Sequence, residues 1–366
     1  MCVTTQEALV ALNMLPKIGP VRVQRLMERF GSADAVLSAK VSDLISVDGI
    51  GPETAEMIRG WESRVDLAAE LREVESRGLT ILTQQDSDFP EALRQSYDPP
   101  LLLYVWGEIK KADRHTVGIV GSRKTTHYGV QTARQFAFQL ASSGMTIVSG
   151  LARGIDTHAH EGAVAAKGRT IAVIGSGLGQ IYPPENMALA EKIAAGHGAV
   201  VSEFPLNTTP SKKTFPMRNR VVAAWSQAIV VVECPVWSGA RITANLAGEL
   251  GRPIYAVPGQ IDRPTSAGCH ALIREGATLV TSGQDILDDF SVLPLQEPNS
   301  ADEETLLPSL AIGEQQIVDA IERGATMVDE ILSETGLSLP EITATLLKLE
   351  MKGRVRQLPG SRFELK

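Results

Sequence analysis

Between residues 116 and 257 the chain alternates short, continuous apolar runs with amphipathic segments, and no other feature restricts its fold as strongly. Strands buried on both faces of a sheet read as continuous apolar runs, whereas strands with one exposed face alternate apolar and polar residues. The runs predicted as strands are Thr116–Val120, Met145–Ser149, Thr170–Ile174, Ala199–Glu203, Ala228–Glu233 and Pro253–Val257. The segments predicted as helices include Tyr128–Ser143, Ile155–Ala166 and Ile242–Leu250. This alternation predicts an α/β core, in which helices cover both faces of a parallel sheet.

The segments that flank this core are predicted to be separate modules. Gly19-Pro20 and Gly51-Pro52 each precede a predicted helix in the same short motif, which resembles the tandem helix-hairpin-helix of SAM-like domains. Near the C-terminus, three predicted helices and two short strands around Pro359-Gly360 resemble a winged helix. The domains expected are residues 1–80 as the helix-hairpin-helix module, 81–290 as an extended Rossmann-like core, 291–309 as an acidic linker with prolines, and 310–366 as the winged helix.

The composition is that of a soluble globular protein, since 43% of the 366 residues are hydrophobic and 21% are charged. No apolar run reaches the roughly 20 residues that span a bilayer, and the N-terminus lacks the pattern of a signal peptide. The three cysteines are far apart and form neither a disulfide framework nor a paired metal motif. We therefore expect a cytoplasmic protein with no membrane partner.

The distribution of charge indicates a polyanionic ligand, although the net charge of the chain is −8. Residues 114–224 contain 12 basic and five acidic side chains, whereas the segments before and after them are acidic. A basic region within an acidic protein can form a local nucleic-acid site, while the acidic remainder limits indiscriminate binding.

The loops that follow the predicted strands are glycine-rich and basic. Ligands of doubly wound sheets bind outside the carboxyl ends of the strands, so these loops are expected to share one edge. Glycines let backbone amides approach an anion, and arginine binds phosphate through two parallel donors. The first three loops contribute Gly121, Ser122, Arg123, Ser149, Gly150, Arg153, Gly175 and Gly177.

The fourth loop combines cations with an aromatic residue, because Lys212, Lys213, Phe215, Arg218, Asn219 and Arg220 lie within nine positions. Lysine and arginine can follow a phosphate backbone, and an exposed phenylalanine can stack on an unpaired base. Such bases are accessible in a single strand and hidden in a duplex. The alternative interpretation makes Phe215 a core residue and pairs the two arginines with Glu203 or Glu233.

The order and spacing of five motifs resemble the DprA (Smf) family of DNA-processing proteins. The motifs are Gly121-Ser-Arg123, Ser149-Gly-Leu-Ala-Arg-Gly-Ile-Asp156, Phe215-Pro-Met-Arg-Asn-Arg220, Ser238-Gly-Ala-Arg-Ile-Thr243 and Ala256-Val-Pro-Gly259. The resemblance implies a non-enzymatic protein with no cofactor that forms a homodimer, binds and protects single-stranded DNA, and loads RecA onto it during natural transformation and homologous recombination. Ala240 departs from the serine of many members.

The same resemblance implies individual roles for the site residues. Arg123 would hold a phosphate, Lys212 would line the same pocket, and Phe215 would stack on a base. Arg218 and Arg220 would complete a basic rim, and Lys213 is placed less firmly because the Lys-x-x-Phe spacing selects Lys212. No catalytic residue and no metal ligand is expected.

Three other functions were weighed against this one. A nicotinamide dehydrogenase fits poorly, because Gln180 stands where the third glycine of the dinucleotide motif belongs. A metal site at Asp156, His158 and His160 would present at most two ligands on one helix face. The strongest alternative is a nucleotide-processing enzyme of the phosphoribohydrolase type, which would need a poised carboxylate such as Glu203 or Glu233 beside the sugar.

Overall fold

The computed structural model describes residues 3–291 and, beyond them, residues 312–323, 325–335, 337, 342, 345–346, 349, 355–358 and 362–365. The chain forms two compact units, Met1–Pro294 and Leu295–Lys366, and each is described here by itself. The predicted linker at 291–309 lies outside the described residues, apart from residue 291.

The first unit begins with the helical module that the glycine and proline pattern predicts. Its helices are α1 (Thr5–Met14), α2 (Pro20–Phe30), α3 (Ala33–Ser38), α4 (Val41–Ile45), α5 (Pro52–Arg59), the 3-10 turn η1 (Trp61–Ser63) and α6 (Leu67–Ser76). Gly19 and Gly51 precede α2 and α5 in extended conformation, and the following prolines occupy the first helical position. The prediction of a helix-hairpin-helix module is confirmed.

The core is a nine-stranded sheet in the order β1-β2-β6-β5-β4-β3-β7-β8-β9. The strands are β1 (Thr80–Thr83), β2 (Leu102–Gly107), β3 (Thr116–Gly121), β4 (Thr146–Ser149), β5 (Thr170–Val173), β6 (Gly198–Ser202), β7 (Ala228–Val232), β8 (Ile254–Ala256) and β9 (Thr278–Leu279). All pairs from β6 to β9 are parallel, which confirms the predicted parallel core. The whole sheet is mixed, because β2 pairs antiparallel with both β1 and β6.

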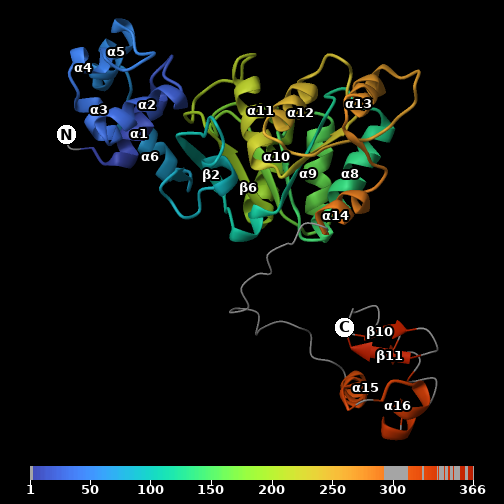
Figure 1. Cartoon of the computed structure of the whole chain (residues 1–366). Coiled ribbons are helices and arrows are strands. Elements are labelled where there is room, and N and C mark those ends of the chain that lie inside the picture. Colours follow the sequence, from blue (N-terminus) through green and yellow to red (C-terminus); the bar gives the residue numbers. More distant parts are fainter. Residues whose placement is uncertain are drawn as a thin grey trace. The chain divides into compact units, whose positions relative to one another are not determined.

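Helices cover both faces of this sheet, as the continuous apolar strands require. The helices are α7 (Glu91–Arg94), α8 (His127–Ser142), α9 (Ile155–Ala165), α10 (Met187–Lys192), α11 (Thr214–Trp225), α12 (Gly239–Glu249), α13 (Pro264–Arg274) and α14 (Gly283–Ser291). Shorter turns are η2 (Lys111–Arg114), η3 (Pro184–Asn186) and the π-helical η4 (Ile193–His197). Figure 1 shows α11, α12 and α13 along one side, and α8 with α14 at the end far from the helical module.

Successive residues of the central strands belong to two different apolar cores. In β7, Ile229 and Val231 pack with α11 and α12, whereas Val230 and Val232 pack with α8 and α9. Both faces of the sheet are therefore buried, and the polar groups at the ends of the strands are left as the accessible part of the sheet.

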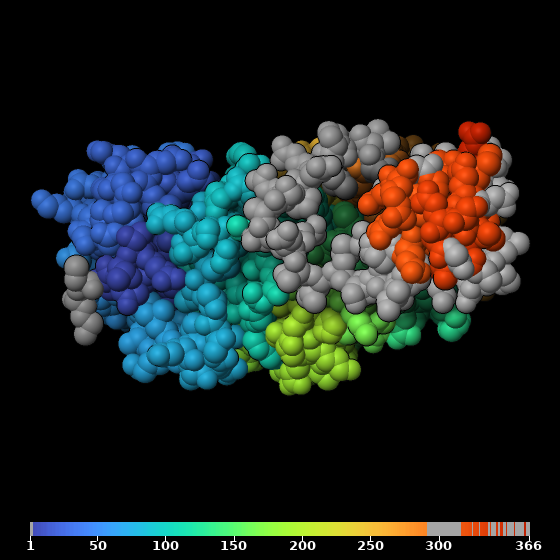
Figure 2. All heavy atoms as spheres, turned by 90° about the horizontal axis from the view of Figure 1, so that it is seen from below, coloured from blue at the N-terminus to red at the C-terminus, as the bar shows by residue number. Residues whose placement is uncertain are grey.

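A third core joins the helical module to the sheet. Leu12 and Leu26 of the module belong to the same buried cluster as Tyr104 and Val200 of the sheet. Polar contacts reinforce this junction: Asn13 Nδ2 donates to the carbonyl of Glu203 at 2.9 Å, and the N–H of Leu206 donates to Glu70 Oε1 at 2.8 Å. In Figure 2 the blue surface of the module continues directly into the cyan surface that follows it in sequence.

The second unit contains the elements predicted for a winged helix. Helices α15 (Ile312–Glu322) and α16 (Val328–Thr335) precede an antiparallel pair, β10 (Val355–Leu358) and β11 (Arg362–Leu365). The unit has its own apolar core, which includes Ile317, Ile331 and Phe363. The winged-helix prediction is confirmed, although most of its predicted third helix lies outside the described residues. Among the described helices, none is long and apolar enough to cross a membrane.

Candidate nucleic-acid interface

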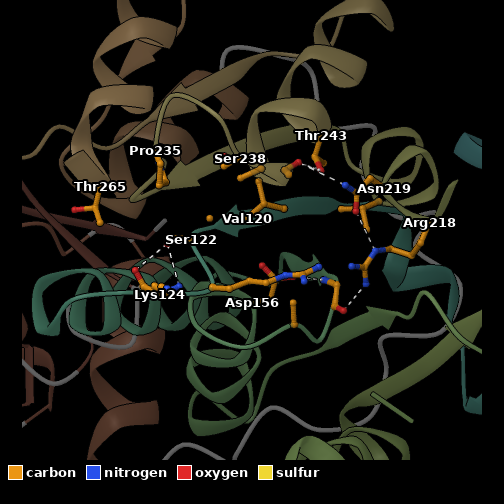
Figure 3. Close-up of a pocket in the computed structure, with 17 residues that line it drawn as sticks. Val120, Ser122, Lys124, Asp156, Arg218, Asn219, Pro235, Ser238, Thr243 and Thr265 are labelled. Atoms are coloured by element: carbon orange, nitrogen blue, oxygen red, sulfur yellow. Dashed lines mark hydrogen bonds between the residues drawn. The ribbon is translucent and has the colours of Figure 1, made fainter. Parts of the chain in front are cut away.

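A cavity of about 550 Å³ opens at the carboxyl ends of β3, β4 and β7. This is the edge at which ligands of doubly wound sheets bind. Figure 3 shows Arg218 at one end of the cavity and Thr265 at the other, with Asp156 and Ser238 between them. Its lining consists of Val120, Gly121, Ser122, Arg123, Lys124, Gly150, Ala152, Asp156, Arg218, Asn219, Val222, Pro235, Ser238, Gly239, Ala240, Thr243 and Thr265.

The loop after β3 projects two cations towards solvent at the cavity. A side chain at Gly121 would collide with the carbonyl of Val232, so the close approach of β3 and β7 requires glycine there. Ser122 is buried, and its hydroxyl accepts a hydrogen bond from the N–H of Lys124 at 3.1 Å and donates one to the carbonyl of Lys124 at 2.8 Å. This tight turn leaves Arg123 and Lys124 exposed.

Arg218 lies at the bottom of the cavity and is only 4% exposed. Its Nη1 donates to the carbonyl of Gly150 and, at 2.6 Å, to the carbonyl of Val173, and its Nε donates to Asn219 Oδ1 at 3.1 Å. The guanidinium therefore ties the loop after β4 and the end of β5 to α11. Although the sequence places it in a basic rim, the structure places it beneath that rim.

Asp156 provides the counter-charge on the floor of the same cavity. Its Oδ2 accepts a hydrogen bond from the N–H of Gly150 at 3.1 Å. Burial raises the pKa of Asp156, and the neighbouring charge of Arg218 opposes that increase. Burial lowers the pKa of Arg218 to about 10, so the guanidinium remains protonated at neutral pH. Burial and the same arginine lower the pKa of His160 to about 3, which keeps this imidazole neutral.

Phe215 is half-buried at the start of α11, directly beside the cavity. A side chain at Gly175 would lie 2.9 Å from the ring, so glycine allows the phenylalanine to sit over the loop after β5. The guanidinium carbon of Arg123 lies 4.7 Å from the ring centroid. The structure thus brings together the proposed stacking residue and the proposed phosphate ligand.

The remaining basic residues of the fourth loop have different surroundings. Lys212 and Lys213 are exposed immediately before α11. Arg220 faces away from the cavity, because it forms ion pairs with Glu203 and with Asp98, the latter at 3.3 Å. For Arg220 the structure matches the alternative interpretation, in which it pairs with Glu203. Asn219 remains in the lining of the cavity, and Arg220 does not.

The other predicted residues mainly determine how the loops pack at this edge of the sheet. Ser149 is buried and its hydroxyl donates to the carbonyl of Ile119 at 2.6 Å. The N–H of Gly177 donates to the carbonyl of Thr208 at 2.9 Å, and this glycine packs against the loop after β6. Gly150 lines the cavity between Arg218 and Asp156. Arg153 is exposed, and it pairs with Glu185 outside the cavity.

Sequence reasoning missed several residues that the structure places at this edge. Lys124 could have been found, because it directly follows Gly121-Ser-Arg123 and continues the basic run. From the sequence, Asp156 is considered only as a metal ligand and Thr243 is given no role, yet both line the cavity. Tyr182 lies next to Phe215, with ring centroids 6.1 Å apart, and no sequence signal linked these two residues.

The geometry does not favour the alternative functions. Among the described residues, no cluster of three or more histidine, cysteine, aspartate or glutamate side chains could hold a metal ion. Glu203 and Glu233 do not line the cavity. Glu203 is buried against Arg220, and the carboxylate of Glu233 accepts hydrogen bonds from the Thr125 hydroxyl at 2.7 Å and the Thr126 N–H at 2.8 Å. Neither carboxylate is placed to act on a sugar in the cavity.

Models of three protein families match this chain in the same order as its domains. The model described as SAM-like helix-hairpin-helix tandem matches residues 9–69, and the one described as DNA recombination-mediator protein A matches 80–291. The model described as DprA winged helix domain matches 301–361.

Individual relatives show the same likeness. Protein Smf of Synechocystis sp. is 34% identical across 97% of this chain and 97% of its own length. DNA processing protein DprA of Streptococcus pneumoniae is 42% identical over 56% of this chain and 72% of its own length. The second of these names confirms the expectation of a DNA-processing protein.

Two solved structures share the fold. The X-ray structure of DNA processing protein A from Streptococcus pneumoniae has a TM-score of 0.69 at 33% identity and covers 79% of this chain and 99% of that chain. The protein from Helicobacter pylori, whose structure is described as giving insights into a unique single-stranded DNA binding mode, has a TM-score of 0.53 at 30% identity. It covers 58% of this chain and 96% of that chain.

Proposed function

Because this chain belongs to the DNA recombination-mediator protein A family, whose members are called DprA or Smf, we propose that it binds and protects single-stranded DNA. The site is the cavity at the carboxyl ends of β3, β4 and β7, together with the exposed loop before α11. Arg123 and Lys124 hold phosphates at the cavity, and Lys212 and Lys213 extend the positive surface. Phe215 stacks on a base beside it.

The observation that carries this proposal is the contrast between paired and unpaired cations. Elsewhere in the core, Arg169 and Arg220 form ion pairs with carboxylates. In the described part of the chain, no carboxylate forms an ion pair with Arg123, Lys124, Lys212 or Lys213. Cations that are concentrated at one edge without carboxylate partners are suited to neutralise the phosphates of a polyanion.

The aromatic ring beside these cations favours a single strand over a duplex. Phe215 is half-buried at the same edge, within 4.7 Å of the Arg123 guanidinium. Stacking on an aromatic ring requires a base whose face is free, and a duplex keeps those faces covered. We infer that duplex DNA gains only the electrostatic part of the interaction.

Two cations beside the glycine turns of the helical module are already paired with carboxylates. Lys17 pairs with Glu53 at 2.8 Å, and Arg25 pairs with Asp48 at 2.7 Å, so both hairpins carry charges that are already neutralised. These pairs favour a structural role for the module over a direct role in DNA binding.

We also propose the finer features that the family resemblance implies: homodimer formation through the Rossmann-like core, loading of RecA, participation in natural transformation and a cytoplasmic location. The domain limits that we propose remain 1–80, 81–290, 291–309 and 310–366. The order of the matching family models supports these limits, and size-exclusion chromatography with light scattering would test the dimer.

The DNA-binding proposal is tested by fluorescence anisotropy with a labelled 20-nucleotide oligothymidylate and with a duplex of the same length. We expect tight, salt-sensitive binding of the single strand and weak binding of the duplex. Arg123→Glu should abolish binding. Arg274→Glu is the matched control, because Arg274 ends α13, about 13 Å along that helix from Thr265 of the cavity. Equal affinities of the wild type and Arg123→Glu would refute the site.

The enzymatic alternative is tested with nucleoside monophosphates as substrates. We expect no release of free base above background, because Glu203 and Glu233 lie outside the cavity. Steady turnover that Glu203→Gln abolishes would overturn the proposal of a protein that only binds DNA.

A further inference from the structure

Tyr182 and Arg153 reproduce, a few ångströms away, the arrangement of Phe215 and Arg123. The guanidinium carbon of Arg153 lies 5.7 Å from the centroid of the Tyr182 ring, as that of Arg123 lies 4.7 Å from Phe215. The two rings are neighbours, with their centroids 6.1 Å apart and their planes inclined at 48°. Two aromatic rings, each covered by an arginine, therefore lie side by side at the same edge of the sheet.

The second pair is positioned by the loops after β4 and β5. Gly154, next to Arg153, has a φ of 80° and approaches the backbone of Arg123, so the two arginine-bearing loops are in contact. Asn186 Nδ2 donates to the carbonyl of Leu151 at 2.8 Å and thereby fixes the segment that follows Tyr182. Tyr182 itself is half-buried, whereas Arg153 is exposed.

We propose that Tyr182 and Arg153 form a second base-binding subsite, in which the Tyr182 ring stacks on a nucleobase and Arg153 binds the adjoining phosphate. The subsite deepens the proposed function and rests on it. It assigns the ligand two neighbouring unpaired nucleotides, one on Phe215 and one on Tyr182.

DNA binding can exchange one contact of each guanidinium for another. In the free protein each guanidinium lies over a ring. When a base stacks on that ring instead, the guanidinium can bind a phosphate. A stacked base strengthens binding about 5- to 150-fold, and an exposed contact between a guanidinium and a ring is equivalent to only about 2- to 5-fold. The exchange is therefore favourable at each ring, and the arginine gains a charge-assisted hydrogen bond.

The separation of the rings determines how the bases are arranged. A base held between two parallel rings needs them about 6.8 Å apart, which is twice the stacking distance of about 3.4 Å per nucleotide. The rings of Phe215 and Tyr182 are closer than this and inclined at 48°. They leave no room for a shared base, so each ring takes a base of its own.

Glu185 lowers the positive charge of the second subsite. It forms an ion pair with Arg153, so the phosphate of an incoming strand must compete with this carboxylate. Arg123 lacks such a partner among the described carboxylates. We therefore expect the first subsite to bind its nucleotide more tightly than the second, and Glu185→Gln to strengthen binding of single-stranded DNA.

The experiment compares Tyr182→Ala with the wild type on two labelled strands, a 20-nucleotide oligothymidylate and the same backbone with abasic sites throughout. We expect Tyr182→Ala to weaken binding of oligothymidylate about 5-fold or more and to leave binding of the abasic strand unchanged. Tyr182→Phe should bind like the wild type, because it retains the ring. Tyr97→Ala, at a tyrosine that is 88% exposed outside the cavity lining, is the matched control.

The outcomes separate this proposal from the function on which it rests. If the wild type binds oligothymidylate but Tyr182→Ala binds it equally well, or loses the same factor on both strands, the second subsite is refuted and the DNA-binding function stands. If the wild type binds neither strand, the proposed function itself fails. A Glu185→Gln variant that binds more weakly than the wild type would also contradict the second subsite.

Discussion

Replacement of Arg218 tests whether this arginine shapes the cavity or touches the DNA. In Arg218→Met the side chain keeps most of its length but loses its charge and its donors. The carbonyls of Gly150 and Val173 then lose a buried donor, and Asp156 loses the nearest compensating charge. A buried acceptor that loses its donor costs about 1–3 kcal/mol, so the two carbonyls together cost about 2–6 kcal/mol. For a domain of this size that loss lowers the melting temperature by about 4–24 °C.

The assay combines thermal unfolding, followed by circular dichroism, with DNA binding at several salt concentrations. Arg123→Met is the control, because Arg123 is exposed and its loss should leave the melting temperature almost unchanged. In Arg123→Met the slope of log affinity against log salt should fall in magnitude by about 0.7, the value for one lost phosphate contact on a single strand. Arg218→Met should have the same slope as the wild type at temperatures well below its unfolding transition. Only unfolding of this variant should change the slope.

The reasoning would be refuted by the opposite pattern. Suppose that Arg218→Met melts at the same temperature as the wild type and that its slope of log affinity against log salt falls by the value of one phosphate contact. The guanidinium of Arg218 would then bind the strand directly. The hydrogen bonds to the carbonyls of Gly150 and Val173 would then be a feature of the free protein alone. Arg218→Lys provides a check on folding, since it retains the buried charge and should fall between the wild type and Arg218→Met.

Three further predictions follow from the same contacts. Burial raises the pKa of Glu203 from its ordinary 4.5 to about 7, so the folded state binds an extra proton between these values. The unfolding free energy should therefore fall by up to about 3 kcal/mol as pH rises from 4.5 to 7, and urea titrations at pH 5 and pH 8 should show this fall in the wild type but not in Glu203→Gln. Gly121→Ala would place a methyl group against the carbonyl of Val232, and we expect calorimetry to show a loss of about 1–3 kcal/mol; an unchanged melting temperature would contradict the close contact. Lys212→Glu should weaken binding of oligothymidylate and reduce its salt dependence without changing the melting temperature, and a large loss of stability would assign Lys212 a structural role instead.

The parallel core could be predicted because its strands are continuous apolar runs, whose burial on both faces leaves few alternatives. The direction of β2 could not be predicted in the same way. Its sequence is as apolar as that of β3, and only a short 3-10 turn separates these two strands. These two strands are not neighbours in the sheet, so their short connection does not set the direction of β2. The direction of β2 is instead determined by its antiparallel pairing with β1 and β6.

The sequence predicts a site at the sheet edge where the structure has its cavity, but the roles proposed for its arginines depend on details that a short motif does not contain. Arg218 and Arg220 are two positions apart on α11, so they point to different sides of the helix. One enters the floor of the cavity and the other pairs with Glu203. The orientation of α11 against the sheet determines which arginine enters the cavity and which one pairs with Glu203. Tyr182 was missed for a similar reason, because its contact with Phe215 joins two loops that are distant in sequence.

The apolar core shared by the helical module and the sheet has a consequence for DNA affinity. Asn13 and Glu70 hold the backbone at residues 203 and 206, where the loop that carries Lys212 and Phe215 begins. A loop that is ordered in advance loses less conformational entropy when a ligand binds. We therefore expect the module to strengthen DNA binding by ordering this loop. A fragment that begins at residue 86 would lose β1, expose Tyr104 and free the start of the loop.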